Sequence, residues 1–267
     1  RVTVENHSDN EREIKLYFHS DFHLYGEKMQ DTAEYEPFFK GVLHYRKKRY
    51  FLVSGQWENS GKGISGFATG KSQYMGKEGT WRDAEDGKLG GNPIEQGSVD
   101  STIEFKDEFF QGEKKVLNMF VMAGVSYGSI QRLYNLYYRQ GAESLFHRTL
   151  AYWQHWSNKQ MFDFSNLSIK VVDLFKRSLL IVKSQIDYTG AIIAANDSDI
   201  IKFNKDTYTY MWPRDGALAV LAMNRSLYAD TAKQFFCFCK ESLILLSGLY
   251  LTGLGKSPTI MAASEAL

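Results

Sequence analysis

The sequence predicts a two-domain chain in which an antiparallel β-sandwich is followed by helices. From Val2 to about Ala123, apolar and polar residues alternate in short runs separated by turns, as in strands with one buried face. Ile14, Leu16 and Phe18 are one such set. From Val125 onward the apolar spacing lengthens towards the 3.6 residues of a helical turn. Because no helical patterns alternate with the strand patterns, an antiparallel sandwich is favoured over a parallel sheet.

Four further strands are predicted in the first half of the chain. Residues 42–46 and 49–53 flank the dipeptide Lys47-Lys48, which indicates a hairpin with a charged tip. Residues 101–105 and 116–123 follow a glycine-rich middle section.

Three motif-like sequences in that middle section are not expected to bind ligands. Residues 61–66 match G-x-G-x-x-G, but no helical pattern follows, so we interpret them as a turn. Residues 69–72 resemble the end of a phosphate-binding loop, yet the glycine required upstream is Ser65. Residues 83–87 lack the ligand spacing of a calcium loop. No cofactor is predicted.

Helical patterns begin after Val125. Two stripes are predicted between residues 125 and 159, formed by Leu133, Leu136 and Tyr137 and by Leu145, Tyr152 and Trp156. Residues 165–183 form a further helix, stopped at the glycine of Asp187-Tyr-Thr-Gly190, and residues 229–246 form another. His147 and His155 lie near one helical face without a third ligand close by, so no metal site is predicted.

The composition disfavours nucleic acid and anionic membranes as partners. The 267 residues include 32 Lys and Arg against 31 Asp and Glu, so the chain carries almost no net charge. The aromatic content of 15% suits both sandwich cores and carbohydrate clefts and does not separate them.

A cytoplasmic location is predicted, because nothing in the sequence indicates export or membrane spanning. Cys237 and Cys239, two residues apart in a predicted helix, point away from each other and are expected to be buried free thiols. No signal peptide and no run of about 18 apolar residues is found. Because Arg1 begins in what resembles the middle of a strand, we expect the natural N-terminus to lie upstream.

The stretch Asp206-Thr-Tyr-Thr-Tyr-Met-Trp-Pro-Arg-Asp215 is the candidate functional site. In an extended conformation the rings of Tyr208, Tyr210 and Trp212 share one face. Pro213 suits the first position of a helix, which places Arg214 and Asp215 in its first turn. Aromatic faces beside a guanidinium and a carboxylate match the C–H faces and hydroxyls of a sugar.

Two structural alternatives stand beside this hypothesis. An aspartate in the first turn of a helix is favoured by the helix dipole, and the adjacent arginine could be its solvated partner. The three rings could equally belong to a core.

Four segments resemble the glucoamylase-type glycoside hydrolases (family 15), in their prokaryotic branch. They are residues 208–215, Gly76-Lys-Glu-Gly-Thr-Trp-Arg-Asp-Ala-Glu-Asp-Gly87, Asn92-Pro-Ile-Glu-Gln-Gly-Ser-Val-Asp100 and Gly190-Ala-Ile-Ile-Ala194. The resemblance implies an antiparallel β-sandwich of super-sandwich type over residues 1–124, lacking its start. It further implies a helical linker over 125–162, packed between domains, and the first helices of an incomplete (α/α)6 barrel over 163–267.

The resemblance implies an exo-acting, inverting hydrolase that releases glucose from the non-reducing ends of α-glucans. Arg214 and Asp215 would hold hydroxyls of the terminal glucose. Tyr208, Tyr210 and Trp212 would line the same subsite. The general acid and base in this family are glutamates from later barrel helices, and no residue of this sequence matches them. We therefore expect the chain itself not to hydrolyse glucans.

Other functions remain open, and the tail departs from the family. A relative that cleaves trehalose or dextran would share this architecture, and a carbohydrate-binding remnant would keep the sandwich without catalysis. The catalytic glutamates are expected beyond Leu267. Residues 249–264 do not resemble the polar loop expected after this helix, so we expect a frameshifted tail from about residue 247.

Overall fold

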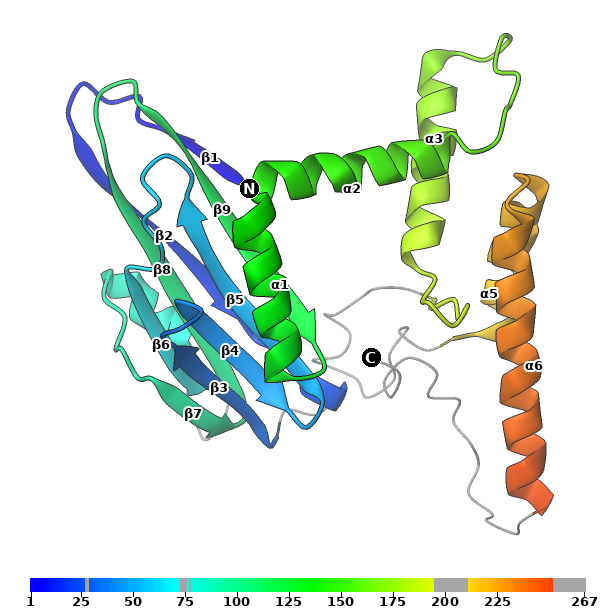
Figure 1. Cartoon of the computed structure of the whole chain (residues 1–267), viewed down its shortest axis with the longest axis horizontal. Coiled ribbons are helices and arrows are strands. Elements are labelled where there is room, and N and C mark those ends of the chain that lie inside the picture. The colour runs from blue at the N-terminus through cyan, green and yellow to red at the C-terminus, as the bar shows by residue number, and fades with distance from the viewer. Residues whose placement is uncertain (27–28, 73–75, 77, 195–210, 252–267) are drawn as a thin grey trace. The chain divides into compact units, whose positions relative to one another are not determined.

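The computed structural model describes residues 1–26, 29–72, 76, 78–194 and 211–251. The chain divides into two compact units, Arg1–Leu145 and Phe146–Leu267. The first unit is built from antiparallel sheets and the second from helices (Figure 1). This order of elements confirms the predicted fold class. Of the tail predicted from about residue 247, residues 252–267 lie outside the described residues.

The larger sheet of the first unit has six strands in the order β1-β9-β5-β4-β3-β7. All neighbouring strands in it are antiparallel. Its strands are β1 (Val2–Glu5), β3 (Asp31–Glu36), β4 (Gly41–Arg46), β5 (Arg49–Trp57), β7 (Ile94–Gly97) and β9 (Lys114–Gly124). The β4–β5 hairpin turns at Lys47 and Lys48, as the sequence predicts, with Arg46 opposite Arg49.

The smaller sheet has three strands in the order β2-β8-β6, also antiparallel. They are β2 (Arg12–Ser20), β6 (Gly66–Lys71) and β8 (Val99–Phe109). The apolar faces of the two sheets enclose the main core, because alternate residues of each strand point the same way. The core's buried members are Ala33, Val42, Val53, Trp57, Val99, Ile103, Phe105, Phe109 and Leu117.

Helix α1 (Tyr127–Gln140) covers the other face of the six-stranded sheet, along β5 and β9 (Figure 1). Its first turn is closed by a capping box between Ser126 and Ser129. Ile130 and Tyr137 are buried in the core below it. Leu133 is predicted on the same face as Tyr137 but is exposed. The buried stripe runs instead through Ile130, Tyr134 and Tyr137.

The helical unit contains most of α2 (Ala142–Ser157), together with α3 (Ile169–Ser184), α5 (Pro213–Arg225) and α6 (Ala229–Leu251). The described residues of this unit form two small cores. Val220 of α5 and Phe235 of α6 belong to the first. Trp156 packs on Tyr228 in the second, and the Tyr228 hydroxyl donates a 3.0 Å hydrogen bond to the Trp156 carbonyl oxygen. In the described residues, no helix is both long enough and apolar enough to cross a membrane.

The prediction of buried thiols is wrong. Cys237 is exposed and Cys239 is partly buried on α6. Two residues rotate a helical position by about 200°, so only one of the pair can face the core of the helical unit. Burial raises the pKa of the Cys239 thiol.

Candidate functional site

The predicted transition from an extended segment to a helix is present at Trp212. Trp212 has extended backbone dihedrals, φ −103° and ψ 114°, and Pro213 is the first residue of α5. Proline suits this position because its missing N–H would have no partner within the helix. Arg214 and Asp215 therefore occupy the first turn, as the sequence predicts.

A small antiparallel arrangement places Trp212 beside a segment about 20 residues earlier in the chain. Ile186 pairs with Ile192, and Ile193 pairs with Met211. Ile192 and Met211 are buried against α5 and α6. Because successive side chains of an extended segment point to opposite sides, the residue after buried Met211 faces outward.

An open pocket of about 440 Å³ lies where these segments meet the start of α5. Among the described residues, its walls are Ala194, Trp212, Arg214 and Asp215. Trp212 is 48% exposed, so its ring is not a core ring. The volume is within the range of small-molecule sites.

Arg214 and Asp215 form an ion pair at the pocket, with 3.3 Å between Nη2 of Arg214 and Oδ1 of Asp215. The Arg214 side chain is 84% exposed and that of Asp215 is 42% exposed. An ion pair this exposed contributes little to folding stability. Both groups therefore keep hydrogen-bonding capacity for a polar ligand.

The structure brings together three of the five residues predicted from sequence. Trp212, Arg214 and Asp215 line one pocket. Tyr208 and Tyr210 lie outside the described residues. Ala194, which also lines the pocket, was not predicted from the sequence as a site residue. The signal for it was its place at the end of Gly190-Ala-Ile-Ile-Ala194, an apolar run and one of the four segments on which the family resemblance rests.

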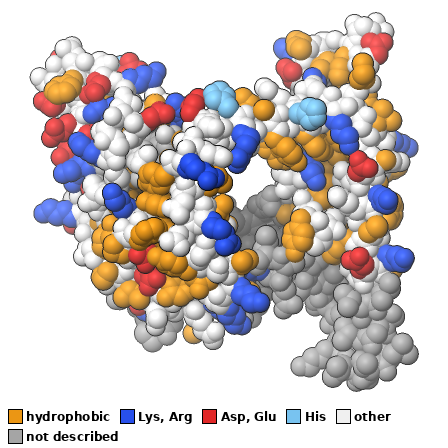
Figure 2. Space-filling view, viewed as in Figure 1, with side chains coloured by type: hydrophobic (Ala, Val, Ile, Leu, Met, Phe, Trp, Pro, Cys, Tyr) orange, Lys and Arg blue, Asp and Glu red, His pale blue; other side chains and the backbone are white. Residues whose placement is uncertain are grey.

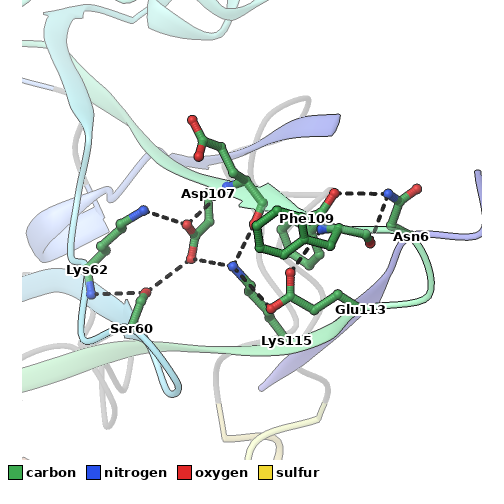
Figure 3. A network of polar contacts seen from close by, with 9 residues as sticks. Asn6, Ser60, Lys62, Asp107, Phe109, Glu113 and Lys115 are labelled. Atoms are coloured by element: carbon green, nitrogen blue, oxygen red, sulfur yellow. Dashed lines mark hydrogen bonds and ion pairs between the residues drawn. The ribbon is translucent and has the colours of Figure 1, made fainter. Parts of the chain in front are cut away.

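A second pocket, of about 380 Å³, lies on the sandwich unit and includes Lys62 and Asp107. Figure 3 shows the buried Asp107 carboxylate between Lys62 and Lys115, with Nζ–Oδ distances of 2.7 and 3.4 Å. Burial alone would raise the pKa of Asp107, but hydrogen bonds from Lys62, the Glu108 amide and Ser60 lower it below its usual value. These contacts join the loop after β5 to β8 and β9, which is a structural role.

The sequence motifs set aside above are structural in the folded chain. The turn lies at residues 58–60, just before the predicted position, and residues 61–66 run from it into β6 without forming a helix. Trp81, Arg82 and Asp83 lie in the short helix η2 (Thr80–Asp86), which packs on the three-stranded sheet. Among the described residues, no group of three His, Cys, Asp or Glu side chains is arranged to hold a metal ion.

Comparison with known proteins connects this fold with a glycoside hydrolase. No protein-family model matches the chain. No curated protein matches it either. Among solved structures, it resembles the crystal structure of a bacterial glucoamylase complexed with acarbose, with a TM-score of 0.62 and 17% sequence identity. The match covers 83% of this chain and 32% of the glucoamylase chain, so this chain spans about a third of that protein's length.

The likeness defines the fold as that of one part of a bacterial glucoamylase chain, antiparallel sheets followed by helices. At this sequence identity it defines the fold alone.

Proposed function

We propose that the pocket at the start of α5 binds the terminal glucose unit of an α-glucan. One juxtaposition supports this: the half-exposed Trp212 ring and the exposed Arg214–Asp215 pair line the same pocket. The C–H face of a pyranose can stack on an aromatic ring, while its neighbouring hydroxyls can bond a guanidinium fork or a carboxylate. Tyr208 and Tyr210 belong to the proposed site as further stacking surfaces.

The reaction that we propose this site serves is exo-acting, inverting hydrolysis that releases glucose from non-reducing ends; this chain supplies the sugar binding, and no described residue of it is assigned as the catalytic acid or base. The fold's likeness to a glucoamylase crystallised with acarbose supports it. Inverting hydrolysis needs two carboxyl groups about 6.5–9.5 Å apart, one to protonate the leaving oxygen and one to activate water. Asp215 is assigned to hydroxyl recognition and not to either of these roles, because its carboxylate is paired with Arg214 and exposed.

The proposal is tested by titrating acarbose into the purified chain and into its Arg214→Lys variant by calorimetry. Lysine keeps the charge but loses the planar fork that can bond two neighbouring oxygens. A hydrogen bond to a charged group contributes about 1.5–3 kcal/mol, so the dissociation constant should rise about 10- to 150-fold.

Arg225→Lys is the matched control, since Arg225 is an exposed arginine at the other end of the same helix. It should leave the affinity for acarbose unchanged. An Arg214→Lys variant that binds acarbose as tightly as the parent would remove Arg214 from the site, and a parent chain that does not bind acarbose would overturn the proposal.

A further inference from the structure

Asp187 holds the turn that follows α3 through a single carboxylate oxygen. Its Oδ1 accepts hydrogen bonds from the backbone amides of Thr189, Gly190 and Ala191, at 2.8, 3.0 and 3.0 Å. It also accepts one from the Thr189 hydroxyl at 2.7 Å. An aspartate that collects the amides following it stabilises a tight turn, and its charge strengthens each bond.

This turn closes a small hairpin whose second arm leads to the pocket. The Asp187 amide donates to the Ala191 carbonyl oxygen at 3.0 Å, and the Ile193 amide donates to that of Gln185 at 3.1 Å. Ile193 also pairs with Met211 on its other side. The residues that follow Ile193 and Met211 are Ala194 and Trp212, which are two of the pocket walls.

Gly190 fixes the hairpin turn against α6. Its φ is +98°, which disfavours any side chain, and a Cβ at this position would lie 2.6 Å from the backbone carbonyl of Gln234. The turn therefore touches the helix backbone directly. Contact with α6 on one side and the Asp187 bonds within the turn leave the second arm little freedom to shift.

From these contacts we infer that Asp187 is a positioning residue for the sugar pocket, acting through the hairpin on Ala194 and Trp212. Asp187 does not line the pocket. It sets the spacing of the two walls, because the turn that it closes determines where Ile193 meets Met211. The inference rests on the proposed function for its ligand, but the geometry of the walls can be measured without one.

The test uses the whole chain labelled with 5-fluorotryptophan and observed by fluorine NMR. The Trp212 resonance is assigned by its loss in Trp212→Phe. Asp187→Ala should shift or broaden that resonance and leave those of Trp57 and Trp81, in the sandwich unit, unchanged. Asp187→Asn keeps an acceptor oxygen and should restore most of the parent signal. Asp173→Ala, which removes an exposed carboxylate of α3, is the control and should change nothing.

The affinity for acarbose gives the second measurement. A displaced wall should weaken acarbose binding about 10- to 100-fold in Asp187→Ala, with most of it recovered in Asp187→Asn. If the parent does not bind acarbose but Asp187→Ala still moves Trp212, the proposed function fails and the positioning role stands.

Three results would overturn the inference. The first is a Trp212 resonance that Asp187→Ala leaves unchanged. The second is equal change at Trp153 and Trp156, which would show general support of the helical unit instead of the pocket. The third is recovery of both signals by Asp187→Leu, which keeps the bulk of the side chain but accepts no hydrogen bond, so that the effect would be attributed to lost bulk.

Discussion

The sandwich unit and the helical unit bury their large apolar side chains to different extents. In the sandwich unit, Trp57, Phe105 and Phe109 have no exposed surface. In the helical unit, Leu174 of α3 is 64% exposed and Phe236 of α6 is 60% exposed. Apolar side chains are visible on the surfaces of both units in Figure 2, so the difference lies in how many large ones each unit also buries completely.

The difference follows from how many faces of each sheet or helix are covered by an apolar partner. The six-stranded sheet has the smaller sheet on one face and α1 on the other, so each face finds an apolar partner. In the described residues, α5 packs on α6 and reaches α3 through Met223, but Leu218 of α5 and Phe236 of α6 stay exposed. Burial contributes about 25 cal/mol per Å² of apolar surface, so the unit with more closed faces gains more from folding. We therefore expect the sandwich unit to be the more stable of the two.

Amide hydrogen exchange should show the largest difference between the units. Amides of the central strands β5 and β8 should exchange only on global opening of the sandwich, whereas those of α3 should exchange through local opening. If the free energies of global and local opening differ by about 4 kcal/mol, the protection factors differ by about 1,000-fold. Mass spectrometry of exchanged peptides measures it. Equal protection of β8 and α3 would contradict the comparison.

The next largest difference between the units should be in the cost of truncating an apolar side chain to alanine. Phe105→Ala deletes a fully buried ring from the sandwich core and should destabilise that unit by about 3–5 kcal/mol. Leu218→Ala removes a side chain that is 62% exposed on α5 and should change stability by no more than about 0.5 kcal/mol. Urea unfolding followed by circular dichroism measures both. A cost for Leu218→Ala as large as that for Phe105→Ala would show that the exposed face of α5 is covered in solution.

The smallest of these effects depends on pH and should be confined to the sandwich unit. His44 is buried, its Nε2 lies 2.7 Å from the Ser101 hydroxyl, and desolvation lowers its pKa from 6.5 to about 3. His19 lowers the pKa further, while Asp21 opposes the shift. The unfolded chain then binds the proton more readily than the folded chain between pH 6.5 and 3. Stability is therefore fully present above pH 6.5 and falls by about 1.4 kcal/mol per pH unit below it, or about 3 kcal/mol by pH 4.

Urea unfolding at several pH values, compared with two histidine variants, measures this slope. In His44→Gln, the free energy of unfolding should fall less steeply than in the parent as the pH is lowered from 6.5 to 4. His7→Gln removes an exposed histidine and should follow the parent. A parent and a His44→Gln variant with parallel pH dependence would show that His44 is protonated inside the fold.

Local patterns in the sequence were enough to predict several of the elements and the nearest part of the site, although β3, β6 and β7 were not predicted. The alternation around residues 42–53 predicted the β4–β5 hairpin and its tip, because side chains of a strand with one buried face repeat every two residues. Pro213 likewise predicted the start of α5, and with it the neighbouring positions of Arg214 and Asp215. Each of these features depends on residues only a few positions apart.

Only the tertiary structure decided which faces are buried and what completes the pocket. Helical periodicity placed Leu133 and Tyr137 on one stripe, but the contact with the six-stranded sheet buries Tyr137 and leaves Leu133 37% exposed. Ala194 joins Trp212 only because Ile193 pairs with Met211, 18 positions later in the chain. Such pairings depend on the packing of α5 and α6 beneath them, and no short-range pattern records a contact between distant segments.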